Sequence, residues 1–434
     1  MKQLTRLFIP ICLETLFYML SGMVDTLMLS AVGDYAVGAV GTANSYIGIF
    51  IIMFSIISSG RVSVMTQNIG AGRPGVAYQA RQLGLLFNAV AGVLMAVFLF
   101  SGAGAILRMV GIADALYEPA LIYLKIVGGG CILNAVIPIF SSYLRAFGYT
   151  KQPLYATIVG NIANFVMNAV FLFVLHKGVA GVATATVISK ILNLCIVLYF
   201  SHKLISAKNS TERIANKTVL GQIVKVGLPS ACETALYNVA MMLVIRFLNQ
   251  MDAEGLNVTA RSYTATISNF SYCVGAALAQ ANAIMTGWHI GAGELEECDR
   301  GTKRAAFVGV CVAVCMETAI VLGSGFIMPL FTDNPEMTAL VRKLLAIDIV
   351  LEIGRVTNLV FGQALKTSGD AVFPAVIAAV FMFVFAVGGT WLFGISMGLM
   401  AVGAYIGLAS DECVRAVGMV WRWKTGKWRT KKLV

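Results

Sequence analysis

The chain begins with an apolar stretch, MKQLTRLFIPICLETLFYML (residues 1–20), in which a proline is followed one helical turn later by a carboxylate. The pattern P-x-x-x-E-T occurs twice, as PICLET at residues 10–15 and as PSACET at residues 229–234. A proline removes a helical hydrogen bond and bends the helix, and a carboxylate inside a membrane helix is costly and usually functional. The second copy therefore suggests that the chain is duplicated.

The composition indicates a membrane protein. The 434 residues are 58% hydrophobic and 12% charged, whereas a soluble domain carries about 25% charged residues. Apolar runs long enough to cross a bilayer recur from end to end. The net charge of +11 falls mostly in connections and in the C-terminal tail, so we attribute it to membrane orientation and expect no nucleic-acid partner.

Glycine, proline and charge divide the chain into twelve hydrophobic segments, which predict an all-α polytopic membrane protein with twelve transmembrane helices. The longest hydrophilic connection lies between the sixth and seventh segments. We therefore expect an N-lobe at residues 1–205 (helices 1–6), a cytoplasmic linker at 206–217, and a C-lobe at 218–434 (helices 7–12) with a basic cytoplasmic tail. The segments lie near residues 5–31, 36–66, 78–106, 116–145, 153–175, 179–201, 218–249, 256–288, 301–329, 337–367, 371–394 and 398–423.

The distribution of Lys and Arg predicts the orientation. An even number of helices places both termini on one side, and that side carries most of the cations, including Lys2, Arg6, Arg145 and the tail from Arg422 to Lys432. Because positive residues favour the cytoplasmic side, we expect both termini in the cytoplasm. The protein should be a multi-pass protein of the plasma (inner) membrane.

Two further motifs recur at nearly the spacing that separates the two P-x-x-x-E-T copies. The turn NIGAG at 68–72 matches HIGAG at 289–293, and LRAFGYTKQP at 144–153 matches LKTSGDAVFP at 365–374, both with the same offset along the chain. An offset of six helices gives both halves the same orientation, so they form a parallel repeat, an architecture of secondary transporters. The glycine turns lack a following G-K-[ST], which excludes a phosphate loop, so we expect an ion gradient to supply the energy.

The motifs PICLET, GMVDTLML, IGAG, LRAFG, GNIANFVMNAVF, GVAGVATAT and DECVR occur in an order that resembles the MATE family of multidrug and toxic-compound extrusion transporters, within the MOP flippase superfamily. The resemblance covers essentially the whole chain; no single motif is specific, but the ordered set is. It implies a two-lobed exporter of twelve helices that is driven by Na⁺ or H⁺.

Asp25 lies in GMVDTLML, well inside the first hydrophobic segment. A carboxylate there can take up a proton or bind Na⁺, and either change would couple an ion to transport. A hydrogen-bonded core aspartate or a helix cap is the alternative interpretation. The resemblance implies that Asp25 couples an ion to transport, because the family carries its N-lobe cation-site aspartate in this V-D-T context.

Asn161, Asn164 and Asn168 recur at i, i+3 and i+7, so they share one helix face, and that face should turn away from lipid. Polar contacts between helices are the alternative explanation. The resemblance implies that Asn164, Asn168 and Thr186 complete a cation site around Asp25. The family commonly has Asp where Asn168 stands, and Na⁺ favours charged oxygen ligands. H⁺ is therefore slightly favoured, and both coupling ions stay open.

Pro10 and Pro229 predict a bend in the first helix of each lobe, and in a rocking helix such a bend can serve as a hinge. Each proline has an acid one turn later. Glu14 lies nearer the cytoplasmic end and is interpreted either as part of this device or as purely structural. Glu233 resembles a C-lobe acid that the family uses for cation or substrate binding.

The tenth segment carries Asp348, Glu352 and Arg355 at i, i+4 and i+7, and therefore on one helix face. An intramembrane arginine needs a partner, and the candidates are Glu352 and Glu233. We interpret the face as a C-lobe site for acid chemistry or substrate. Some MATE branches place an acid about where Arg355 stands, which argues against a Na⁺ site in this lobe.

Other charges inside spans receive simpler interpretations. Asp411, Glu412 and Arg415 in the last segment are expected near its cytoplasmic end, as a structural pair or gate. Lys190 is expected to pair or to extend its ammonium group toward the interface. Glu317 is a pore-lining candidate without local support.

These observations predict cation-coupled antiport of small organic compounds by rocker-switch alternating access. Acids outnumber cations inside the spans, which favours cationic or neutral amphiphiles. The alternatives are a lipid-linked oligosaccharide flippase of the same superfamily, which would favour several arginines around a pyrophosphate, a channel, and an intramembrane enzyme. The enzyme is disfavoured because the three histidines offer no triad or metal spacing. We expect a monomer in the lipid bilayer, without a cofactor.

Overall fold

The computed structural model describes residues 2–110, 112–205, 212–252 and 255–434. Over these residues the chain is helical, with short connections and no β-strand. Residues 206–211 of the expected linker lie outside the described residues. The elements are α1 (Lys2–Ser30), α2 (Asp34–Gly70), α3 (Pro74–Val110), α4 (Asp114–Gly129), α5 (Cys131–Ala146), α6 (Lys151–Ala169) with η1 (Val170–Val174), α7 (Gly178–Leu204), α8 (Asn216–Met251), α9 (Leu256–Ala292), α10 (Leu295–Ile327) with η3 (Met328–Leu330), α11 (Pro335–Ser368), α12 (Val372–Phe381) with η4 (Met382–Val387) and η5 (Thr390–Ser396), α13 (Met400–Lys424) and η6 (Lys427–Thr430).

These elements make an all-α polytopic membrane protein. When consecutive pieces are joined, the described residues form twelve long helical segments in the order expected from the sequence. Seven helices are long and apolar enough to cross a bilayer, and α4 with α5, which bend by 41° at their junction, make an eighth. Both α11 and α13 carry charged side chains in their middle turns, where these groups require burial against other helices.

The chain divides into two compact units of similar internal packing. One comprises Ile9–Gly227, here called the N-terminal unit, and the other comprises Met1–Phe8 with Leu228–Val434, here called the C-terminal unit. Each boundary falls next to a proline, Pro10 in α1 and Pro229 in α8. In both α1 and α8, the residues before the boundary belong to one unit and the residues after it belong to the other.

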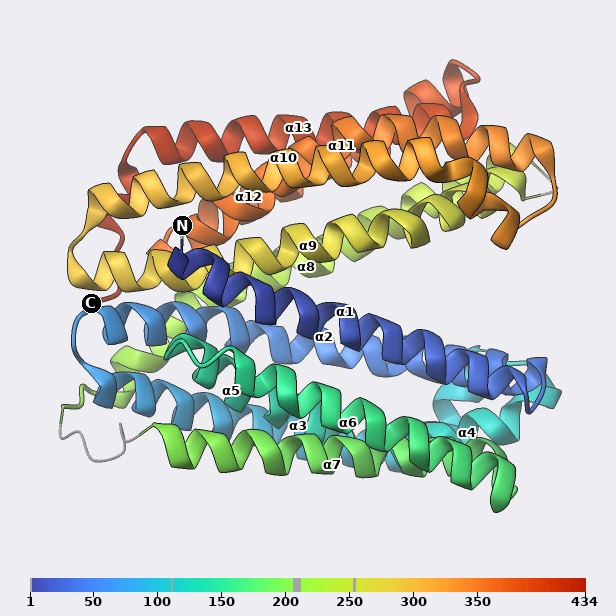
Figure 1. Ribbon diagram of the computed structural model, residues 1–434, viewed down its shortest axis with the longest axis horizontal. Helices are drawn as coiled ribbons and strands as arrows, with labels where there is room; N and C mark the ends of the chain where they lie inside the picture. Colours follow the sequence, from blue (N-terminus) through green and yellow to red (C-terminus); the bar gives the residue numbers. More distant parts are fainter. Residues whose placement is uncertain (1, 111, 206–211, 253–254) are drawn as a thin grey trace. The chain divides into compact units, whose positions relative to one another are not determined.

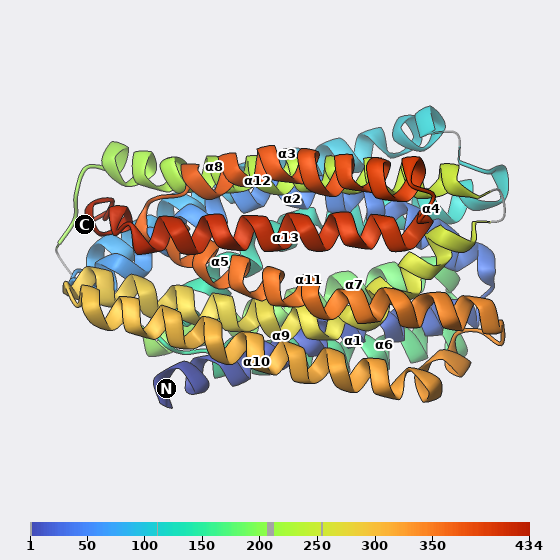
Figure 2. The same ribbon diagram turned by 90° about the horizontal axis from the view of Figure 1, so that it is seen from above.

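Inside each unit the helices lie side by side along their lengths (Figure 1). In the N-terminal unit α3 packs against α2, α4 and α5, and α6 packs against α7. In the C-terminal unit α11 is the central helix and packs against α9, α10 and α13 (Figure 2). This central position explains how α11 can carry charges: its polar face is covered by three neighbouring helices.

Backbone conformation repeats between the two halves. Gly72 and Gly293 follow α2 and α9 with φ of 74° and 79°, and Gly148 and Gly369 end α5 and α11 with φ of 83° and 98°. Side chains with a Cβ rarely adopt this left-handed conformation, which is why both recurring motifs contain glycine at these positions. At the same offset as these glycines, the π-helical η1 after α6 corresponds to η5 after α12. These recurrences confirm the internal repeat predicted from the sequence.

Candidate functional site

The two acids of the P-x-x-x-E-T motifs form equivalent ion pairs, one in each unit. Glu14 of α1 pairs with Arg145 of α5 at 2.5 Å. Glu233 of α8 pairs with Lys366 of α11 at 2.8 Å. All four side chains are at least four-fifths buried. An ion pair removed from water requires both partners, because either one alone would be an uncompensated charge.

Neither ion pair was predicted from the sequence, although the signal was present. Arg145 and Lys366 both occupy the second position of a recurring motif, LRAFG in the first half and LKTSG in the second. Glu14 and Glu233 are related by nearly the same offset along the chain. Because an acidic motif and a basic motif both recur after nearly the same number of residues, a contact between them in one half predicts the same contact in the other half. The Glu233–Arg355 pairing considered from the sequence is wrong, because Glu233 makes its salt bridge with Lys366 and lies only within electrostatic range of Arg415.

The predicted polar site of the N-terminal unit is assembled where α1 meets α6. The Asn168 side-chain amide donates to Asp25 Oδ1 at 2.8 Å and to Asn164 Oδ1 at 3.1 Å. Asn164 and Asn168 are buried, whereas Asp25 is partly exposed. Asn161, two turns earlier than Asn168, donates to the Phe17 carbonyl at 2.9 Å. The asparagine face therefore packs against α1, and Asp25 is held by a neutral amide rather than by a cation.

Two residues that received no role at Asp25 from the sequence complete this polar centre. Tyr123 of α4 is buried and lies within reach of Thr186, Asn44 and Asp25. Lys190 of α7 donates to Asn134 Oδ1 at 2.8 Å and lies within electrostatic range of Asp25. Thr186 itself donates to the carbonyl of Val182 in its own helix at 2.9 Å, which leaves its hydroxyl oxygen able to accept.

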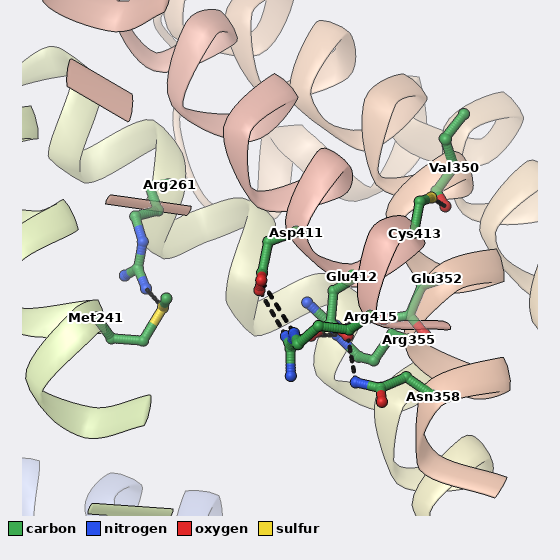
Figure 3. Close-up of polar contacts among 10 residues, drawn as sticks. All are labelled: Met241, Arg261, Val350, Glu352, Arg355, Asn358, Asp411, Glu412, Cys413 and Arg415. Atoms are coloured by element: carbon green, nitrogen blue, oxygen red, sulfur yellow. Dashed lines mark hydrogen bonds and ion pairs between the residues drawn. The ribbon is translucent and has the colours of Figure 1, made fainter. Parts of the chain in front are cut away.

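The charged residues of the C-terminal unit form one network between α11 and α13. Arg355 donates to Glu352 on its own helix and approaches Glu412 of α13, with Nε 3.9 Å from Oε1. Arg415 bridges Asp411 at 2.6 Å and Glu412 at 2.8 Å. Figure 3 shows Arg415 turned onto the Asp411 carboxylate. The two helices are thus joined through the Glu412 carboxylate, which faces both arginines.

Further contacts place this network deep in the unit. Asn358 of α11 donates to Glu412 Oε2 at 3.0 Å (Figure 3). Asp411, Glu412 and Arg415 are buried in the middle third of α13 rather than near its end, which corrects the location expected from the sequence. Their pairing was expected and is confirmed.

Asp348 and Glu352 share a buried face of α11 with a third acid, Glu317 of α10. Carboxylate oxygens of the three residues lie within 4.8 Å of one another. The i, i+4 spacing in the sequence predicted the first two residues, and the third came from a separate helix. Among the described residues, these three form a group of acids with the geometry to share a cation.

The polar centre of the N-terminal unit is not repeated at the equivalent positions of the C-terminal unit. At the offset that relates the glycine turns, Asn168 corresponds to Gly389 and Thr186 corresponds to Gly407. These two glycines lie so close that a Cβ on Gly389 would be 2.9 Å from the Cα of Gly407. Helix contact therefore occupies the space that polar side chains fill in the N-terminal unit. The duplicated scaffold carries two different polar centres.

Comparisons with known proteins agree with this architecture. The MatE family model matches residues 10–170 and 229–392, one stretch in each half. The chain is 32% identical over 428 residues to the uncharacterized transporter YisQ of Bacillus subtilis, covering 97% of this chain and 94% of that protein. It is 20% identical over 446 residues to the probable multidrug resistance protein NorM of Thermotoga maritima, covering 100% and 94%.

Solved structures show the same fold. The outward-facing conformation of a multidrug resistance MATE family transporter of the MOP superfamily superposes with a TM-score of 0.84 at 21% identity, covering 98% of this chain and 96% of that one. A mutant of the Vibrio cholerae MATE transporter VcmN superposes with a TM-score of 0.88 at 17% identity, covering 99% and 98%.

Proposed function

Because this chain belongs to the MatE family of transporters, we propose that it is a secondary active exporter that exchanges H⁺ or Na⁺ for small organic compounds. The observation that carries this proposal is Asp25, a carboxylate within a membrane-spanning helix that is held by the neutral amide of Asn168. Because no cation pairs directly with this carboxylate among the described residues, it is able to bind and release one during a transport cycle. The protein is a transporter and not an enzyme.

Protons are the better-supported coupling ion. The family's second acid is replaced by Asn168, which removes a charged ligand for Na⁺. A proton needs one carboxylate oxygen and no coordination shell.

Alternating access would follow from rocking of the two units, with Pro10 and Pro229 as hinges. The division of the chain next to both prolines supports this role. A helix lacking one backbone hydrogen bond bends there at lower cost than elsewhere. We place both termini in the cytoplasm on the strength of the Lys and Arg distribution. We further propose that the protein works as a monomer in the plasma (inner) membrane.

The substrates would be cationic or neutral amphiphiles. Arg355 and Arg415 are both engaged by acids of α11 and α13, so they do not offer a free cluster of guanidinium groups. A lipid-linked pyrophosphate would require such a cluster. The paired arginines therefore weigh against the flippase alternative.

The test is dye efflux from proteoliposomes under separate Na⁺ and pH gradients, with wild type, Asp25→Asn and a matched control, Asp114→Asn. Asp114 is an exposed acid at the start of α4, so its neutralisation should leave efflux unchanged. We expect a pH gradient alone to drive efflux in the wild type and the control, and Asp25→Asn to abolish it. Full coupled efflux by Asp25→Asn under both gradients would contradict the assignment.

A further inference from the structure

The last residues of the chain, 425–434, fold against the C-terminal unit instead of extending away from it. Their short helix η6 carries Trp428, which is 1% exposed and stacks on Trp423 of α13 with the ring centroids 4.2 Å apart. The ring nitrogen of Trp428 also donates to the Trp423 carbonyl at 3.0 Å. Leu433 is buried as well. This stretch, here called the C-terminal segment, is therefore a packed part of the unit.

Polar and backbone contacts fix the C-terminal segment to the ends of two helices. Arg429 of η6 pairs with Glu296 in the first turn of α10 at 2.8 Å. The carbonyl of Lys431 lies so close to Gly369, the residue that ends α11, that a Cβ on this glycine would overlap it. The segment thus bridges the start of α10 and the end of α11.

The cations between residues 422 and 432 fall into two sets. The two arginines form ion pairs, Arg422 with Asp370 at 2.7 Å and Arg429 with Glu296 at 2.8 Å, and these pairs hold the segment and the end of α13 in place. The lysines are all exposed and form no ion pair among the described residues; they are Lys424, Lys427, Lys431 and Lys432. Because Asp370 and Glu296 are already engaged by the arginines, the lysines present a positive surface.

The exposed face of α13 indicates what this positive surface meets. Val417, Trp421 and Lys424 recur at i, i+4 and i+7, so they share one helix face. Val417 is 71% exposed, Trp421 is 57% exposed, and Lys424 is exposed. An apolar residue, then a tryptophan, then a lysine is the order in which a membrane helix passes from hydrocarbon through the interface to the headgroups. Lys424 therefore stands at the level of the lipid headgroups.

We propose that the four exposed lysines of this region bind the headgroups of anionic phospholipids. Lysines next to a membrane helix attract acidic lipids, each by about fivefold in affinity. The surface continues from an exposed apolar face that ends in Trp421, and a lipid meets both parts, whereas a soluble acidic partner would meet only the lysines. The stacked tryptophans and the two arginine pairs hold the lysines in place, so binding does not require the segment to become ordered.

Bound lipid would in turn favour the folded segment. The segment covers Gly369 and the first turn of α10, so anionic lipid should stabilise this end of the C-terminal unit. Neither the coupling ion nor the transported compound enters this proposal, and its outcome is therefore independent of the test of Asp25.

The experiment counts bound lipids by native mass spectrometry of the purified full-length protein in detergent. The protein is titrated with phosphatidylglycerol and, separately, with phosphatidylcholine of the same acyl chains. The test variant is Lys424→Gln/Lys427→Gln/Lys431→Gln/Lys432→Gln. The matched control removes the same charge from exposed lysines of the N-terminal unit that we expect on the same side of the membrane, as Lys151→Gln/Lys203→Gln/Lys217→Gln/Lys225→Gln. Trp428→Ala keeps every charge but removes the tryptophan stack.

We expect wild type and the control to bind phosphatidylglycerol in preference to phosphatidylcholine. The test variant should need at least about tenfold more phosphatidylglycerol for half occupancy, with its phosphatidylcholine binding unchanged, and Trp428→Ala should fall between the two. The lysine surface is refuted if the test variant binds phosphatidylglycerol as wild type does, or if the control loses as much affinity. Displacement of phosphatidylglycerol by an equal concentration of glycerol 3-phosphate would also overturn the proposal, because the ligand would then be a soluble phosphate. Wild-type affinity in Trp428→Ala would contradict the role of the folded segment.

Discussion

The repeated ion pairs make a quantitative prediction about the role of Glu233. At an effective dielectric of about 20, opposite unit charges at the 2.8 Å of Glu233 and Lys366 attract by about 6 kcal/mol, and desolvation offsets much of this. Removing one partner of a buried pair costs about 3–5 kcal/mol. Because these side chains keep 11–20% of their exposure, we expect the lower limit, about 3 kcal/mol, for Glu14→Gln and for Glu233→Gln alike.

The assay is thermal unfolding in detergent, followed as the loss of the monodisperse peak after heating. For a unit of roughly 200 residues, about 3 kcal/mol corresponds to a fall in apparent Tm of about 6–12 °C. Neutralising both partners of a pair should recover most of the lost stability. We expect a coupling energy of about 2 kcal/mol in the double-mutant cycles Glu14→Gln/Arg145→Gln and Glu233→Gln/Lys366→Gln. The crossed double variant Glu14→Gln/Lys366→Gln is the control and should be additive within about 0.5 kcal/mol.

One result would refute this reasoning. If Glu233→Gln keeps the wild-type Tm and abolishes efflux, while Glu14→Gln lowers the Tm, the two acids are not equivalent. Glu233 would then act as the ion- or substrate-binding acid that the sequence suggested, and its ion pair would be only one state of a working group. The structural role of both acids is supported if Glu14→Gln and Glu233→Gln lose the same stability. Arg145→Gln should then restore the stability of Glu14→Gln, and Lys366→Gln should restore that of Glu233→Gln.

Three further predictions concern packing and charge. Lys190→Met should let Asp25 hold either H⁺ or Na⁺ more tightly, because it removes the positive charge next to the carboxylate, and pH-driven efflux should then persist to higher pH; an unchanged pH profile in proteoliposomes would argue against this role. Gly354→Ala should destabilise by about 1–3 kcal/mol through overpacking, because its Cβ would lie 2.7 Å from the α13 backbone, whereas Gly362→Ala on the same helix has room and should be neutral or stabilising in the same unfolding assay. Asn257→Ala should cost about 1–3 kcal/mol, since the buried side chain accepts from the first turn of α13 at 3.0 Å; a Tm equal to that of wild type would contradict this value.

Local patterns in the sequence predicted most of the fold. Apolar length gave the helical segments, because each must match the bilayer thickness. The recurring motifs revealed the duplication, and their glycines occupy left-handed turns that other residues rarely adopt, at Gly72 and Gly293 and at Gly148 and Gly369. The i, i+3, i+7 spacing of the asparagines predicted one polar face, and in the structure Asn164 and Asn168 do lie with Asp25.

The sequence by itself therefore determined the all-helical class, the internal repeat and the polar faces of single helices, because each of these is set by spacing along the chain. The tertiary structure alone decided which faces meet. It paired Glu233 with Lys366 instead of Arg355, brought Lys190 near Asp25, and added Glu317 from α10 to the acids of α11. Helical periodicity fixes the direction of a side chain on its own helix, but the partner across a contact depends on how helices distant in sequence pack together.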